Sequence, residues 1–198
     1  MITLLFAILT FALLIKLNEI LGVNVGFKLK KEDLNDLTAD SAEIRELSEQ
    51  ERIWKTISRS CPKFDEKDFL RKSEKVFALV FKAYADGDKS TLKDLLSPRT
   101  FKAFSLAIDD RKERGETLEG NILQFVETEL MDVNVSGNNI YITVKFVTDQ
   151  TTSLRSMDGT ILEGSPDYVE SRTDIWVFSK KASSSDPRWF LHEIKSED

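Results

Sequence analysis

Few residues in this chain have the types and spacing that support chemistry. The 198 residues include one cysteine, Cys61, and one histidine, His192, which excludes an internal disulfide and a His/Cys metal site and leaves a cysteine–histidine pair only if the two meet. Glu127 and Glu129 share one face of a predicted strand and have the spacing of an acid/base pair. Nothing places a substrate beside them, and we interpret both as solvent-exposed. We therefore predict no catalytic, metal-binding or cofactor-binding residue, and a non-enzymatic function.

Composition describes a folded chain with enough length for one ordinary domain plus attachments. The net charge of -6 argues against nucleic acid as the main partner, because nucleic-acid binding relies on cationic surfaces.

The N-terminus carries an apolar run. Residues 2–15 have no charge, and apolar residues continue past Lys16, so we predict a transmembrane anchor over residues 1–22, although a span normally needs about 20 apolar residues. A signal peptide would need basic residues before the run, and none stands before Lys16. A third alternative is an apolar helix packed on a soluble domain, but a helix without a polar face is poorly suited to that position.

Basic residues after the run set the expected orientation. The positive-inside rule places the C-terminal bulk on the cytoplasmic side, as a single-pass protein of the inner membrane. The same cluster is a candidate membrane-proximal contact for acidic headgroups: Lys28, Lys30 and Lys31.

A charged connector, residues 23–63, is expected next. Residues 40–59 read as a helix with a narrow apolar stripe formed by Ile44, Leu47, Trp54 and Ile57. The stripe fits docking on the domain, on a partner or on the bilayer surface, and the sequence does not choose among these.

Residues 64–198 form the predicted folded domain, which begins with helices. Asp65 has the position of an N-cap, Gly87 ends the first long helix, and Ser97-Pro98 opens another with proline at its first position.

Residues 120–195 then read as strands. Ser136-Gly137-Asn138-Asn139 is a hairpin signal, and residues 140–149 alternate so that Ile140, Ile142, Val144 and Phe146 face the core. Helices followed by a strand meander predict an α+β fold, with helices on one face of a curved antiparallel sheet and a cone-shaped cavity between them.

The order of several motifs resembles that of the Tim44-like domain family. The likeness covers roughly residues 64–194 and rests on residues 80–88 (VFKAYADGD), residues 92–98 (LKDLLSP), Phe101, Phe104, residues 176–178 (WVF) and residues 187–191 (PRWFL). The resemblance implies an NTF2-like or cystatin-like fold with a deep apolar pocket. The mitochondrial member of this family binds the inner membrane and its acidic lipids, and tethers a chaperone to the translocation channel. This chain departs from it in its expected membrane span and in lacking the chaperone-binding N-terminal region, and it looks more like bacterial membrane-anchored relatives.

Aromatic residues are the candidate pocket lining, with plain core packing as the alternative for each: Phe77, Phe81, Tyr84, Phe101, Phe104, Tyr141, Phe146, Trp176 and Trp189. We expect a membrane-anchored scaffold that supports protein translocation or membrane-protein assembly by binding protein segments or acidic lipid, with translocase or other membrane proteins as partners and no nucleic acid. Two alternatives are an NTF2-like small-molecule-binding protein or enzyme of isomerase or dehydratase type, and a purely structural anchor with a filled core.

Overall fold

The computed structural model describes residues 49–62 and 64–195, which form four helices and one four-stranded antiparallel sheet. The helices are α3 (Glu49–Ser60), α4 (Glu66–Asp86), α5 (Lys89–Leu95) and α6 (Pro98–Glu113). The strands are β1 (Thr117–Ser136), β2 (Asn139–Arg155), β3 (Ile161–Lys181) and β4 (Phe190–Lys195), in the spatial order β1-β2-β3-β4. The predicted α+β class is confirmed. No helix within these residues is long and apolar enough to cross a membrane, and the predicted anchor, with Lys28, Lys30 and Lys31, lies outside the described residues.

Local sequence signals set the helix boundaries as predicted. The Asp65 carboxylate accepts a hydrogen bond from the backbone N–H of Asp68 at 2.9 Å and caps α4. Gly87 ends α4 in the left-handed conformation, with φ of 69°. Ser97 caps α6, and Pro98 occupies its first position.

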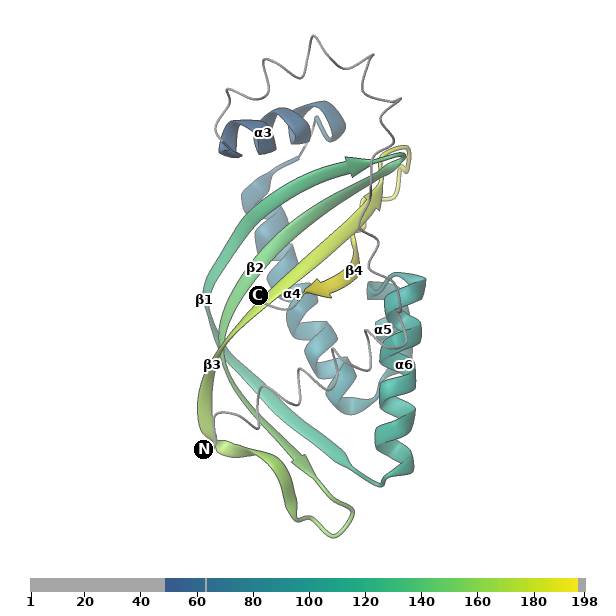
Figure 1. Cartoon of the computed structure of the whole chain (residues 1–198), viewed down its shortest axis with the longest axis vertical. Coiled ribbons are helices and arrows are strands. Elements are labelled where there is room, and N and C mark those ends of the chain that lie inside the picture. The colour runs from purple at the N-terminus through teal and green to yellow at the C-terminus, as the bar shows by residue number, and fades with distance from the viewer. Residues whose placement is uncertain (1–48, 63, 196–198) are drawn as a thin grey trace, which may run out of the picture.

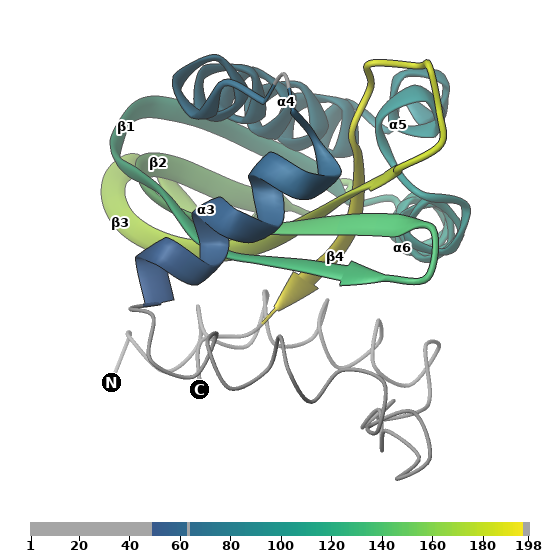
Figure 2. The same cartoon turned by 90° about the horizontal axis from the view of Figure 1, so that it is seen from above.

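The sheet is long and strongly curved, and α4, α5 and α6 lie along one side of it (Figures 1 and 2). Curvature comes from interruptions in strand pairing, because β1 has three register shifts against β2, between Ile122 and Gln124, Phe125 and Glu127, and Leu130 and Asp132. The predicted curvature of the sheet is therefore present. β4 is tied to the α5–α6 junction through a hydrogen bond from the Ser97 backbone N–H to the Leu191 carbonyl at 2.8 Å.

The core lies between α4 and the concave face of the sheet. The predicted inward set of β2 is confirmed, since Ile140, Ile142, Val144 and Phe146 are all buried. Phe77 of α4 stacks on Trp176 of β3 with ring centroids 4.4 Å apart, and its ring also lies 4.9 Å from that of Phe146. These aromatic contacts fix α4 to the middle of the sheet.

Helix α3 packs against β1 at the end of the sheet that carries the β1–β2 turn (Figure 1). Ile53 and Ile57 are buried and belong to the core, whereas Trp54 is 40% exposed. Of the docking alternatives for this stretch, the described part of the helix therefore docks on the domain, and the inward residue beside Ile57 is Ile53 and not Trp54. Ile44 and Leu47 lie outside the described residues.

Gly164 allows β2 and β3 to approach each other closely near the turn that joins them. It has a φ of 75°, and a Cβ there would collide with the Thr152 carbonyl oxygen. Gly137 also has a positive φ, 56°, but has open space around it. We expect Gly137→Ala to lower the free energy of unfolding by about 1–2 kcal/mol, the cost of a left-handed alanine. Gly164→Ala should lower the free energy of unfolding by about 1–3 kcal/mol more than Gly137→Ala does, because of the collision.

Urea unfolding of both variants measures this difference. Equal losses at the two positions would show that β2 and β3 are not closely packed at Gly164.

Candidate functional site

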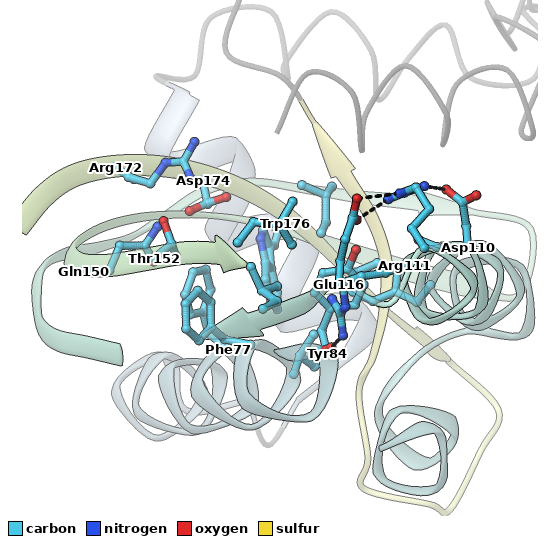
Figure 3. A pocket seen from close by; sticks show the side chains of 18 residues that line it. Phe77, Tyr84, Asp110, Arg111, Glu116, Gln150, Thr152, Arg172, Asp174 and Trp176 are labelled. Atoms are coloured by element: carbon cyan, nitrogen blue, oxygen red, sulfur yellow. Dashed lines mark hydrogen bonds and ion pairs between the residues drawn. The ribbon is translucent and has the colours of Figure 1, made fainter. Parts of the chain in front are cut away.

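A cavity of about 220 Å³ lies between α4, α6 and the concave face of the sheet (Figure 3). Its apolar walls come from Phe77, Val80, Phe81 and Tyr84 of α4, Phe104 and Ala107 of α6, Leu118 of β1, Leu154 of β2, Trp176 of β3 and Ile194 of β4. The filled core expected of a purely structural anchor is therefore not what the structure shows. The cavity has room for one large side chain or a short apolar chain, but it is smaller than the ~300–1,000 Å³ of most small-molecule sites.

One side of the cavity is lined by an ion-pair group at the C-terminal end of α6. The Arg114 guanidinium donates from Nε to Glu116 Oε1 at 2.8 Å, lies 2.7 Å from Glu116 Oε2 through Nη2, and also pairs with Asp110. The hydrogen bonds that Arg114 donates to Glu116 and, second in size, to Asp110 raise its pKa. Both carboxylates are already paired with Arg114, so this side of the cavity is polar, and with two carboxylates to one guanidinium the group keeps one net negative charge.

Arg111 holds the cavity end of α4 in place. Its Nη2 donates to the backbone carbonyls of Tyr84 at 2.7 Å and Ala85 at 2.9 Å, and its guanidinium carbon lies 4.9 Å from the centre of the Tyr84 ring. A cation at the C-terminus of a helix is favoured by the helix dipole, and these bonds go to carbonyls of the last turn, of which that of Tyr84 also accepts from the Gly87 backbone N–H at 3.2 Å. Arg111 is buried, and its Nη1 has no hydrogen-bond partner within the described chain.

The sheet side of the cavity also carries polar side chains, as Figure 3 shows for Gln150, Thr152, Arg172 and Asp174 opposite Phe77 and Tyr84. Gln150 and Trp176 are each only 4% exposed. The side-chain oxygen of Gln150 and the indole N–H of Trp176 find no hydrogen-bond partner among residues 49–62 and 64–195. Burial raises the pKa of the Asp174 carboxyl, while the nearby Arg172 partly opposes that rise.

The predicted pocket residues divide into two sets. Five of the nine line this cavity: Phe77, Phe81, Tyr84, Phe104 and Trp176. The other four do not: Phe146 is fully buried behind the cavity wall, Phe101 packs half-buried against the core, Tyr141 contacts His192 with ring centroids 5.0 Å apart, and Trp189 lines a different hollow. They were assigned together because aromatic residues at helical or strand spacing do not reveal which part of a continuous core is empty.

The polar residues of the cavity were missed, although three of them carried a signal. Gln150 continues the even-numbered series of β2 that faces the core, and Asp174 shares a strand face with Trp176 and Phe178. Arg111 stands three residues after buried Ile108 and on the same helix face. The spacing along the strands and the helix therefore placed these positions on the inward face, although their residue types are ones that usually face solvent.

A second hollow, of about 860 Å³, lies between the N-terminal half of α4, the end of α5 and the connection from β3 to β4. Its base is aromatic, with Phe69 and Trp189 ring centroids 5.3 Å apart, and Lys75 and Lys180 stand at its rim. Cys61 lines this hollow, whereas His192 lines neither.

The structure also shows where the other residues considered for catalysis lie, namely Glu127, Glu129 and His192. Lys145 Nζ lies 3.1 Å from Glu127 and 3.6 Å from Glu129, and both carboxylates are exposed outside the cavity. Desolvation lowers the pKa of His192, whose backbone carbonyl accepts a hydrogen bond from Thr100. Within the described part of the chain, no group of three histidine, cysteine, aspartate or glutamate residues has a metal-binding arrangement.

Comparison with known proteins gives the family. Residues 50–196 match the family model described as the Tim44-like domain. This chain belongs to the Tim44-like domain family. It is 24% identical over 147 residues to "Mitochondrial import inner membrane translocase subunit TIM44-1" of Arabidopsis thaliana, covering 71% of this chain and 31% of that protein. It is 23% identical over 152 residues to "Mitochondrial import inner membrane translocase subunit TIM44" of Homo sapiens, covering 75% of this chain and 34% of that protein.

The Tim44-like chain thus spans about a third of the length of these relatives. Solved structures with a distant likeness include the intermembrane space region of the chloroplast protein ARC6, with a TM-score of 0.45, 17% identity, and coverage of 68% of this chain and 97% of that one. Another is a putative dehydratase of the NTF2-like family from Streptomyces avermitilis, with a TM-score of 0.32, 11% identity, and coverage of 65% and 96%.

The raised pKa of Asp174 predicts a pH-dependent effect on stability. Because the folded state holds this proton more tightly than the unfolded state, the carboxyl costs stability as pH rises above its ordinary pKa. Relative to the wild type, Asp174→Asn should therefore gain stability between about pH 4 and about pH 7. Urea unfolding across this range measures the effect, with the exposed Asp167→Asn of the same strand as control. A stability difference between Asp174→Asn and the wild type that stays constant with pH would show that folding does not raise the pKa of Asp174.

Proposed function

We propose that this chain is a membrane-anchored, non-enzymatic binding module that holds an apolar segment of a protein or an acidic lipid in its cavity. The observation that carries the proposal is the cavity itself, which has aromatic walls while the carboxylates of its α6 side are paired with Arg114. Such a site offers apolar surface for binding and little unpaired acid or base for chemistry. The relatives named as translocase subunits support a role in protein translocation or membrane-protein assembly.

Binding in the cavity can be tested by photo-crosslinking in cells. Phe81 lines the cavity, whereas its neighbour Lys82 is exposed and pairs with Asp86. A photo-reactive benzophenone side chain at position 81 should yield adducts to one or a few membrane or newly made proteins, or to phospholipid. The same group at position 82 is the control and should yield neither, because it points away from the cavity. Equal adducts from both positions, or adducts from position 82 alone, would show that the cavity is not the working surface.

Membrane anchoring is supported by the uncharged residues 2–15 and by the lysines that follow them. The full chain should stay in the membrane pellet after extraction with alkaline carbonate, and a chain lacking residues 1–22 should be released. In vesicles, added protease should reach the domain only when the cytoplasmic face is outward. Release of the full chain by carbonate would refute the anchor, and cleavage in vesicles of the opposite orientation would refute the topology.

One observation favours a second candidate, a small-molecule-binding protein or an enzyme of isomerase or dehydratase type built on an NTF2-like cone. A carboxyl with a raised pKa, Asp174, lines the cavity, and such groups serve as general acids or bases. This candidate predicts no protein or lipid adduct from position 81. It also predicts that a neutral small molecule raises the melting temperature of the wild type but not that of Asp174→Asn.

A further inference from the structure

Residues that line the cavity carry buried polar atoms that have no partner among the described residues. Three buried side chains contribute them: the oxygen of Gln150, the indole N–H of Trp176 and Nη1 of Arg111 have no hydrogen-bond partner in the described part of the chain. A buried donor or acceptor left unpaired costs about 1–3 kcal/mol. An occupant that suits this cavity therefore accepts from Trp176 and Arg111 and donates to Gln150.

The charges of the residues that line the cavity limit which class of molecule can bind there. The charged residues that line the cavity are three acidic and three basic: Asp110, Glu116 and Asp174 against Arg111, Arg114 and Arg172. Arg114 is already held by Asp110 and Glu116, and Arg172 Nε lies 3.8 Å from Glu170 Oε2. A charged headgroup would meet as much repulsion as attraction there, so the polar part of the occupant is neutral.

Hydrogen bonding then distinguishes the two occupants considered under the proposed function, a lipid and a protein segment. A hydrocarbon tail fits the aromatic walls, but it has no donor or acceptor and leaves all three polar atoms unpaired. A peptide group is neutral and carries both a donor and an acceptor, and an extended polypeptide presents them between apolar side chains. One apolar side chain also suits a cavity of about 220 Å³.

We propose that the natural occupant of this cavity is an uncharged, extended polypeptide segment. One of its apolar side chains lies between Phe81 and Phe104, and a neighbouring peptide group donates to Gln150 and accepts from Trp176. This inference rests on the proposed function, since it names which of the two classes of occupant the cavity binds.

Binding of two probes to the purified full chain tests the assignment. The first is a fluorescent, end-blocked peptide of leucine, phenylalanine and alanine, with a set of analogues in which each central amide in turn is replaced by an ester. The second is a dansyl-labelled undecanoic acid. An ester lacks the N–H donor, so one analogue should bind the wild type about three- to tenfold more weakly than the parent peptide.

That loss should vanish in Gln150→Leu, which has no oxygen to accept the bond, and it should persist in Gln124→Leu, a matched change at an exposed position outside the cavity. Trp176→Phe keeps the aromatic wall but removes the indole donor, and should weaken binding of the parent peptide by a similar factor. Thermal unfolding of each variant confirms that the fold is kept.

The outcomes separate this inference from the proposed function. If the undecanoic acid binds and the peptide does not, and Gln150→Leu tightens the acid, the cavity is an acyl-chain site and the inference is wrong while the proposed function stands. An ester loss that is equal in the wild type and in Gln150→Leu also overturns the inference. If neither probe binds the wild type, the inference and the proposed function both fail.

Discussion

The stacking of Phe77 on Trp176 is the contact on which the rest of the domain depends. It joins the middle of α4 to the middle of β3, and the Phe146 and Phe125 rings close around it, with centroids 4.9 Å and 5.6 Å from that of Phe77. On one side of this contact the space between helix and sheet is filled by residues such as Phe69 and Phe178. On the other side the sheet curves and the polar residues Gln150, Arg172 and Asp174 interrupt its apolar concave face, so the helix and sheet pack less closely and a cavity remains.

Arg111 keeps that cavity from collapsing. Two charge-assisted hydrogen bonds from Arg111 to the carbonyls of Tyr84 and Ala85 link the last turn of α4 to α6, beside the edge contact of the Tyr84 and Phe104 rings, whose centroids lie 5.2 Å apart. Bonds of this kind fix the distance between two helices more narrowly than apolar contacts do, because they depend on direction. The aromatic contact and the arginine thus act at opposite ends of the C-terminal half of α4.

Sequence reasoning recovered the features that depend on neighbours in the chain. The cap at Asp65, the glycine end at Gly87 and the turn at Gly137 each follow from local backbone chemistry. β2 runs to Arg155, beyond the alternating residues 140–149, because backbone hydrogen bonding continues where the apolar alternation ends. Long-range packing was beyond reach: Trp189 faces the second hollow and not the cavity, and Ile53 turns inward in place of Trp54, because a partner surface chooses between adjacent residues that helical spacing treats alike.

The polar atoms of the cavity explain why its apolar walls are not enough to define its role. A leucine at position 150 and a phenylalanine at position 176 would fit an apolar pocket and remove two unpaired groups that each cost about 1–3 kcal/mol. That cost is large beside a total stability of about 5–15 kcal/mol. A cavity meant only for hydrocarbon would gain from those replacements. Gln150 and Trp176 are useful in this position only when an occupant completes their hydrogen bonds, so they confer selectivity for a polar, uncharged group inside an otherwise apolar site.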